Sequence, residues 1–153
     1  MVKFFWLPLL FLALLFGCAD DIVLEGDTDL VGVYNAFYYY TEGYGSSNPT
    51  TTKVKLTWNF ISDKSFNYAV DNEDPFTDSD HGVCDASQGT YSRTTLNEIV
   101  FSDVIASVGS VCDDETLVDA NFNFRTAEDT IIIDRLVAEQ SRNFVIKLIK
   151  VTQ

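Results

Sequence analysis

The sequence predicts an all-β fold, a single antiparallel up-and-down β-barrel of about eight strands. Three segments carry this prediction, because apolar and polar residues alternate along each of them with the period of two that a half-buried strand requires. No stretch sustains the helical spacing of apolar residues for three turns. The alternating apolar residues are Val54, Leu56, Trp58 and Phe60; Phe66, Tyr68 and Val70; and Val118, Ala120, Phe122 and Phe124.

Weaker strand patterns, separated by turns rich in Gly, Asp, Asn and Ser, complete the set. Residues 62–65 form a short polar turn suited to a hairpin between the first two strong strands. An antiparallel sheet of this size is best closed into a barrel, because closure removes the exposed edges. Eight strands leave room either for packed side chains or for one small ligand. The weaker segments are residues 33–40, 89–93, 98–104, 130–134 and 143–151.

The N-terminal residues have the pattern of an export signal. Lys3 precedes 13 uncharged residues, a run too short to span a bilayer of about 30 Å as a helix. The following Leu15-Phe16-Gly17-Cys18 resembles a bacterial lipoprotein signal, which implies cleavage before Cys18 and lipidation of its sulfur. We therefore expect a signal peptide at 1–17, the lipidated Cys18 and an acidic tether at 18–29, and the barrel at 30–153. An ordinary secretory signal is the alternative.

Charge and composition narrow the class of partner. The 153 residues are 46% hydrophobic, which excludes a disordered acidic tail. Removal of the signal takes only Lys3 among the charged residues, so 9 basic and 23 acidic residues remain, a net charge of −14. Such a charge argues against nucleic acid as a partner. We expect a lipid-anchored protein of the bacterial cell envelope, in the outer membrane or at the cell surface, that contacts the membrane through the lipid on Cys18.

The predicted strands resemble those of lipocalin-like domains, which implies a small hydrophobic ligand inside the barrel. Consecutive tyrosines on a strand point to both faces, so some of residues 38–40 line the interior and others face outward. The motifs are Leu30-Val31-Gly32-Val33-Tyr34, the hairpin around Asp63-Lys64-Ser65-Phe66 in which Lys64 replaces the usual Gly, and Gly89-Thr90-Tyr91-Ser92 followed by Ile99-Val100-Phe101. The candidate ligand-binding residues are Tyr34, Tyr38, Tyr40, Trp58, Phe60, Phe122 and Phe124.

A second resemblance leads to another function. Cys84, the strand motif at 89–91 and Cys112 are similar to the layout of META-type domains of bacterial lipoproteins. This resemblance implies a filled β domain without a ligand, acting as a structural or protein-interaction module of the envelope. The two functions, ligand carriage and docking of an envelope protein, both remain open at this point.

The cysteines divide into one candidate for lipidation and one pair. Cys84 and Cys112 lie at loop positions of an exported domain, where an even number of cysteines predicts a disulfide. Closing this 28-residue loop stabilises the fold by about 3 to 4 kcal/mol in the chain-entropy model. A pair of free thiols is the alternative.

Acidic residues cluster around the two loop cysteines. Oxygen-rich loops of this kind can bind Ca²⁺, and Asp78, Asp80, Asp113 and Asp114 are weak candidates for such a site. The segment breaks the EF-hand pattern, so a solvated acidic loop is favoured and no metal is predicted.

Catalytic patterns are scarce. His81 is the only histidine, which excludes two-histidine metal centres. The chain has no Gly-x-Ser-x-Gly elbow, phosphate loop or dinucleotide fingerprint. The sequence therefore predicts a protein that is not an enzyme and needs no cofactor.

Overall fold

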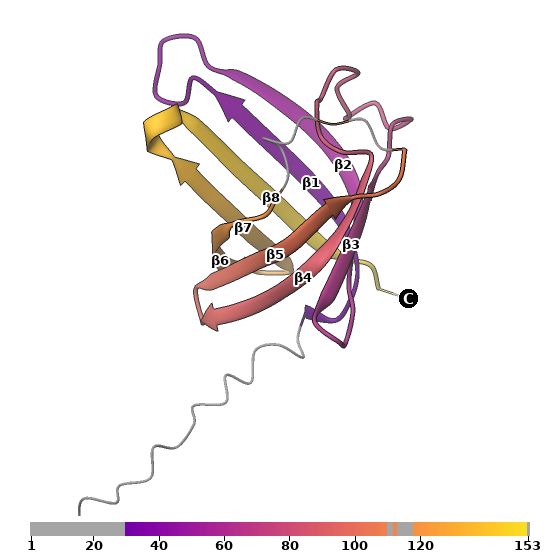
Figure 1. The fold of residues 1–153 in the computed structure, drawn as a ribbon. Helices are drawn as coiled ribbons and strands as arrows, with labels where there is room; N and C mark the ends of the chain where they lie inside the picture. Colours follow the sequence, from indigo (N-terminus) through magenta and orange to yellow (C-terminus); the bar gives the residue numbers. More distant parts are fainter. Residues whose placement is uncertain (1–29, 110–111, 113–117, 153) are drawn as a thin grey trace, which may run out of the picture.

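Eight antiparallel strands close into one barrel, which confirms the predicted fold (Figure 1). The computed structural model describes residues 30–109, 112 and 118–152, so the predicted signal peptide and the tether with Cys18 lie outside the described residues. No helix within these residues has the length and apolar character needed to cross a bilayer. The strands are β1 Gly32–Glu42, β2 Thr50–Phe60, β3 Ser65–Val70, β4 Ala86–Thr95, β5 Glu98–Ala106, β6 Asn121–Ala127, β7 Thr130–Val137 and β8 Arg142–Lys150, with a short 3-10 helix at Ala138–Gln140.

Pairing between the first and last strands closes the sheet. β1 pairs with β8 from Tyr34↔Lys150 to Glu42↔Arg142, and with β2 along its whole length. The backbone groups of β1 are therefore bonded on both sides, and this part of the sheet has no free edge.

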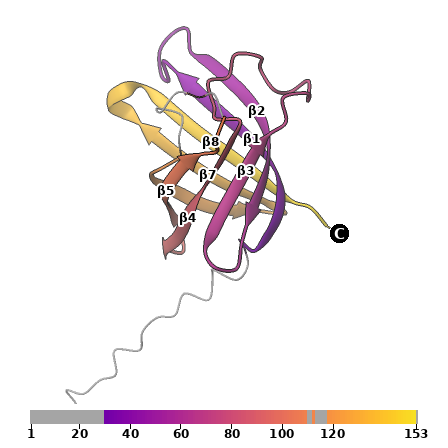
Figure 2. The ribbon, with the colours of Figure 1, turned by 45° about the vertical axis from the view of Figure 1, so that its right-hand side comes forward.

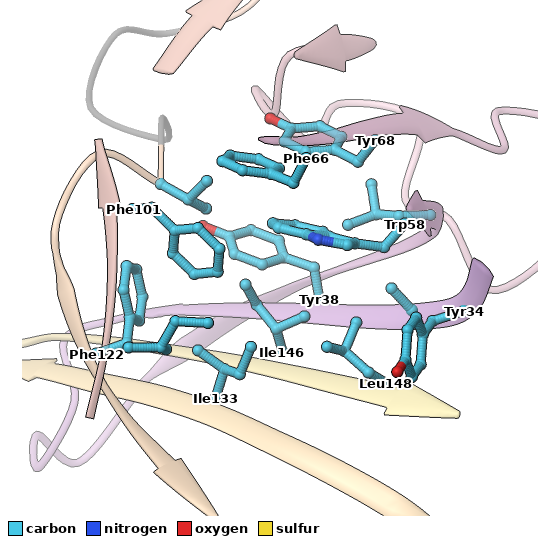
Figure 3. Packing of buried hydrophobic residues seen from close by; sticks show 14 of the residues in the cluster. Tyr34, Tyr38, Trp58, Phe66, Tyr68, Phe101, Phe122, Ile133, Ile146 and Leu148 are labelled. Carbon is cyan, nitrogen blue, oxygen red and sulfur yellow. The ribbon is translucent and has the colours of Figure 1, made fainter. Parts of the chain in front are cut away.

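Inward-pointing side chains of the strands form one core, as the alternating pattern predicts. Trp58 is fully buried at its centre, and its indole stacks on Phe66 at 5.0 Å and on Tyr68 at 5.1 Å between ring centroids (Figure 3). Phe101 contacts the same indole at 5.5 Å. Pairs of this kind contribute about 0.5 to 1.5 kcal/mol each beyond the burial of their area.

The β5–β6 boundary differs from the sequence prediction. The alternating pattern begins at Val118, but β6 begins at Asn121. β5 and β6 pair over only three residue pairs, from Glu98↔Asn123 to Val100↔Asn121, so the chain before Asn121 does not belong to the ladder. The carbonyl of Ala120 still accepts a hydrogen bond from the Phe101 N–H, and Val118 is 4% exposed. The apolar pattern thus marks burial here, and the strand starts later.

The barrel has two unlike ends (Figure 1 and Figure 2). Tight turns at 61–64, 96–97 and 128–129 lie at one end, which we call the turn end. The longer connections, at 43–49, at 71–85 and between β5 and β6, lie at the other, which we call the loop end. The described chain starts at the turn end with the buried Leu30, whose carbonyl accepts a hydrogen bond of 2.8 Å from the Tyr34 hydroxyl.

A disulfide links two of the connections at the loop end. Cys84 precedes β4 and Cys112 lies between β5 and β6, and their sulfurs are bonded, as the sequence predicts. Cys84 is fully buried. The bond therefore ties the end of the β3–β4 connection to the connection between β5 and β6, 28 residues later in the chain.

Lys64 occupies a backbone conformation that suits glycine, at φ 66° in the β2–β3 turn. We predict that Lys64→Gly raises the free energy of unfolding by about 0.5 to 1 kcal/mol, because it removes a left-handed strain larger than the entropy that glycine adds to the unfolded chain. Urea unfolding monitored by Trp fluorescence measures the change. Lys64→Ala is the matched control, since its Cβ keeps the strain. Equal stability of the Gly and Ala variants would contradict the prediction.

Candidate functional site

The structure brings the predicted ligand-binding residues together inside the barrel. Three of the rings contact one another directly: Tyr34 meets Phe60 edge-on at 5.7 Å, and Trp58 meets Phe60 at 5.9 Å between centroids. These side chains therefore pack as a core. The exposed fractions are 0% for Trp58, 1% for Tyr34, Tyr38 and Phe60, 3% for Phe122, 5% for Phe124 and 8% for Tyr40.

Tyrosines near the ends of the barrel have hydrogen-bond partners. Tyr40, toward the loop end, donates to Glu42 Oε1 at 2.8 Å, and its ring lies 5.0 Å from that of Phe144. Tyr34, toward the turn end, donates to the Leu30 carbonyl. Tyr39 points outward, so the tyrosine run is divided between the two faces as predicted.

Polar atoms deeper in the barrel lack the hydrogen-bond partners that the tyrosines near its ends have. Within the described residues, the hydroxyls of Tyr38, Tyr68 and Ser87 and the Trp58 Nε1 have no hydrogen-bond partner. Burial raises the pKa of Tyr38 far above its ordinary value, with Tyr68 and Tyr40 adding to the rise. Burial also raises the pKa of Tyr68, and the neighbouring Ser87 hydroxyl offsets part of this effect although the pair does not meet the geometry of a hydrogen bond. Sequence reasoning left Tyr68 and Ser87 out of the candidate site; their inward positions on alternating strands were the available signal.

The acidic β3–β4 connection folds back along the outer strand edge of β2. β2 extends beyond the last residue of β3, and residues 71–78 occupy the edge that β3 leaves open. The Lys53 carbonyl accepts from the Asp78 N–H at 2.9 Å, while the Lys53 N–H donates to Asp78 Oδ2 at 2.7 Å. The Lys55 ammonium forms ion pairs with Asp71 and Asp74. These three carboxylates hold the connection on the sheet, so the segment is more than the solvated loop that its composition favours.

An aromatic side chain anchors the same connection. Phe76 packs edge-on against Phe37 at 5.2 Å and against Tyr39 at 5.7 Å, on the outer face of β1. The Lys147 ammonium lies 5.2 Å from the centroid of the Tyr39 ring, close enough for a cation–π contact. The only aromatic residue within residues 71–85 thus fixes the acidic connection to the barrel wall.

The weak calcium candidates do not converge in the described part of the chain. Asp78 is engaged with the Lys53 backbone, and Asp80 lines a hollow of about 340 Å³ beside the disulfide. Asp113 and Asp114 lie outside the described residues. Among residues 30–109, 112 and 118–152, no group of three or more His, Cys, Asp or Glu side chains is placed to hold a metal ion.

His81 is held in a hydrogen-bonded chain beside this hollow. Its Nδ1 accepts the Val83 N–H at 3.1 Å, so the proton of the neutral ring lies on Nε2, which donates to Asn72 Oδ1 at 3.1 Å. The Asn72 amide in turn donates to Asp85 Oδ1 at 3.2 Å. Both ring nitrogens are therefore used in ordering the connection.

The fold and the buried aromatic site define a class of protein by architecture: a closed, eight-stranded, up-and-down antiparallel β-barrel, compatible with a lipocalin-like fold. Comparison of the chain with protein-family models, with curated proteins and with solved structures finds no match.

The ion pair of Lys55 with Asp74 makes a pH-dependent contribution. The hydrogen bond from Lys55 lowers the pKa of Asp74 from its ordinary 3.8, and the hydrogen bond to Asp74 raises the pKa of Lys55 from 10.5. A lowered carboxyl pKa stabilises the fold above pH 3.8, and this gain is lost as the pH falls through the folded pKa; the lysine gain is present below pH 10.5 and is lost at higher pH. Lys55→Gln should thus lower the melting temperature at neutral pH and have little effect at pH values below the folded pKa of Asp74.

Thermal melts across an acid pH series measure this difference. Lys147→Gln is the matched control: it removes a lysine that contacts the Tyr39 ring, so its effect should not change through the acid range. A Lys55→Gln penalty that persists unchanged in strong acid would show that the ion pair is not its cause.

Proposed function

We propose that this protein is a membrane-anchored bacterial lipoprotein of the cell envelope, without enzymatic activity, whose filled barrel is a protein-interaction module. The burial of the seven candidate ligand residues supports this role over ligand carriage, because side chains that line an open ligand space would be more exposed. In this reading the barrel is a rigid support for its loops.

The two ends of the barrel carry the proposal. The described chain begins at the turn end, so a lipid on Cys18 would hold that end toward the membrane. The tether at 18–29 could extend for about 40 Å at most. The loop end, with its long connections and disulfide, would then face away from the bilayer, where another envelope protein can reach it.

The surface of the loop end is acidic and carries an exposed aromatic ring. Glu73 and Asp80 are exposed on the connection that Phe76 anchors, and Tyr44 is 49% exposed on the neighbouring β1–β2 loop. The Tyr44 N–H donates to the Ser141 carbonyl at 2.7 Å, which fixes this loop to the β7–β8 turn. An ordered acidic surface with an exposed aromatic ring favours a basic protein surface as the partner.

Charge reversal at the two ends tests the proposal. A photo-crosslinking residue at Tyr44 should give a protein adduct in the native envelope, and Glu73→Lys with Asp80→Lys should reduce its yield at least several-fold, because the substitutions remove the charge complementarity. Glu128→Lys with Asp129→Lys is the matched control at the turn end and should leave the yield unchanged. Absence of an adduct at Tyr44, or equal loss with both variants, would contradict docking at the loop end.

A second candidate function, carriage of a small hydrophobic ligand in the barrel, is favoured by the short β5–β6 seam. Three residue pairs join these strands, whereas β1 and β2 pair from Gly32 to Glu42. Ile99 and Phe122 form the middle pair of the seam and are both buried in the core. A seam with few bonds opens at a lower free energy than a long ladder, so it offers an apolar molecule a route to the interior.

Crosslinking the seam tests this second candidate. We expect Val100→Cys with Asn121→Cys, at facing positions of β5 and β6, to slow the binding of an apolar fluorescent probe when oxidised and to restore it when reduced. Wild type under the same two conditions controls for the native disulfide. If the wild-type protein shows no saturable fluorescence increase with the probe N-phenyl-1-naphthylamine, carriage of an apolar ligand is contradicted.

A further inference from the structure

A hollow of about 530 Å³ opens at the turn end of the barrel, at the edge of the aromatic core. It lies between the β6–β7 turn and the end of β8, where Thr130 pairs with Ile149 (Figure 1). Its volume falls within the range of about 300 to 1,000 Å³ that small-molecule sites occupy. Six of the nine residues that line it carry a charge or an aliphatic hydroxyl: Lys150, Glu128, Asp129, Thr126, Thr130 and Thr152.

Packing holds the Lys150 side chain in place at this hollow. Its ammonium lies 6.0 Å from the centroid of the Tyr34 ring, at the limit of a cation–π contact. Its Cε lies over Gly32, where an added Cβ would come within 3.0 Å of it. Tyr34 is fixed in turn, because its hydroxyl donates to the Leu30 carbonyl at 2.8 Å. The position of Lys150 is therefore set without a carboxylate.

Charges of both signs line the hollow without pairing to each other. Among residues 30–109, 112 and 118–152, no ion pair or hydrogen bond involves the side chains of Lys150, Glu128 or Asp129. Opposite charges elsewhere on the barrel do pair, as Arg125 does with Asp134. The hollow thus presents one positive group and two negative groups that are available to a ligand.

This combination of charges limits the class of ligand. Two carboxylates disfavour a simple anion, and the Lys150 ammonium disfavours a simple cation. Within the part of the chain that the structure describes, no group of three or more His, Cys, Asp or Glu side chains is placed to hold a metal ion. An apolar molecule would take the charged groups and hydroxyls out of water without giving them partners. A molecule that carries both charges satisfies both kinds of group.

We propose that this hollow binds a small zwitterion in which a primary ammonium is joined to a phosphate. The ammonium donates to the carboxylates of Glu128 and Asp129, and the phosphate accepts from Lys150 and from the threonine hydroxyls. A phosphate suits these donors better than a carboxylate, because it has more oxygens to accept from one lysine and three threonines.

Free phosphoethanolamine and the headgroup of phosphatidylethanolamine share this chemistry. The headgroup source rests on the proposed function, in which the lipid on Cys18 directs the turn end toward the bilayer. The free molecule as a source does not depend on the anchor. The hollow also lies at the opposite end of the barrel from Tyr44, so binding here and docking at the loop end are independent.

Calorimetric titration with O-phosphoethanolamine tests the site in solution. The chain of residues 18–153 with Cys18→Ser is used, because it carries no lipid. Lys150→Gln should weaken a saturable binding by about tenfold or more, the loss expected for one charge-assisted hydrogen bond. Lys147→Gln is the matched control on the same strand, outside the hollow, and should leave the affinity unchanged. Equal weakening by both variants would overturn the proposal.

A change of selectivity separates binding from a loss of folding. Lys150→Gln leaves the two carboxylates, so it should bind the simple cation ethanolamine more tightly than the wild type does. Glu128→Gln with Asp129→Asn leaves the ammonium and should bind inorganic phosphate more tightly than the wild type does. A variant that is only destabilised gains neither probe. Failure of both gains, at unchanged melting temperatures, would overturn the proposal.

Vesicles distinguish the two sources of the zwitterion. The Cys18→Ser chain is sedimented with vesicles of phosphatidylcholine alone or with added phosphatidylethanolamine. The quaternary ammonium of phosphatidylcholine has no N–H to donate to Glu128 and Asp129. Sedimentation that requires phosphatidylethanolamine and that Lys150→Gln reduces identifies a lipid headgroup. Binding of free O-phosphoethanolamine without sedimentation identifies a free molecule.

Binding to neither probe, or equal sedimentation with both kinds of vesicle and no free binding, would overturn the proposal. Incorporation of labelled palmitate at Cys18 in cells tests the anchor separately. A failure of the anchor is thereby distinguished from a failure of the zwitterion site, which is measured on a chain without lipid.

Discussion

Pairing between β1 and β8 is the constraint on which the other features of this barrel depend. It joins the two ends of the sheet from Tyr34↔Lys150 to Glu42↔Arg142, so every strand gains one inner and one outer face. A shift of one residue would exchange the faces, moving Tyr38 to the surface and Tyr39 into the core. The register thus selects which aromatic residues become the core and which, like Tyr39, remain outside to hold the β3–β4 connection through Phe76.

The fold could be predicted from the sequence because a barrel with one dry face repeats its pattern every second residue. Val54, Leu56, Trp58 and Phe60 all point inward in β2 and are at most 2% exposed. The pairing of the two loop cysteines was also predictable from the sequence. Two cysteines remain in a domain that is expected to be exported to an oxidising compartment, where such a pair forms a disulfide. Strand ends were harder to place: Val118 has the alternating pattern and the burial of a strand residue, but the short β5–β6 ladder excludes it.

The candidate site was only partly predictable, because its missing parts depend on contacts between distant segments. Composition describes residues 71–85 as acidic, and it does not reveal that Asp78 bonds to Lys53, 25 residues earlier. In the same way, Ser87 becomes a neighbour of Tyr68 only through the β3–β4 register. The 15-residue connection between these strands is too long for local sequence patterns to fix that register. The alternation of apolar and polar residues along a strand predicts which face a residue lies on. Its neighbours on that face depend on the register of the strand pairing.

The position of a buried tyrosine along its strand decides whether its hydroxyl finds a hydrogen-bond partner in such a barrel. An eight-stranded barrel needs large side chains to fill its interior, and aromatic rings provide the volume. Near either end a tyrosine can use its hydroxyl, as Tyr34 does with Leu30 and Tyr40 with Glu42. In the middle layer, phenylalanine or isoleucine fills space without an unpaired polar atom, and Phe101 and Ile146 do so. The hydroxyls of Tyr38 and Tyr68, which have no hydrogen-bond partner among the described residues, are the exception to this pattern.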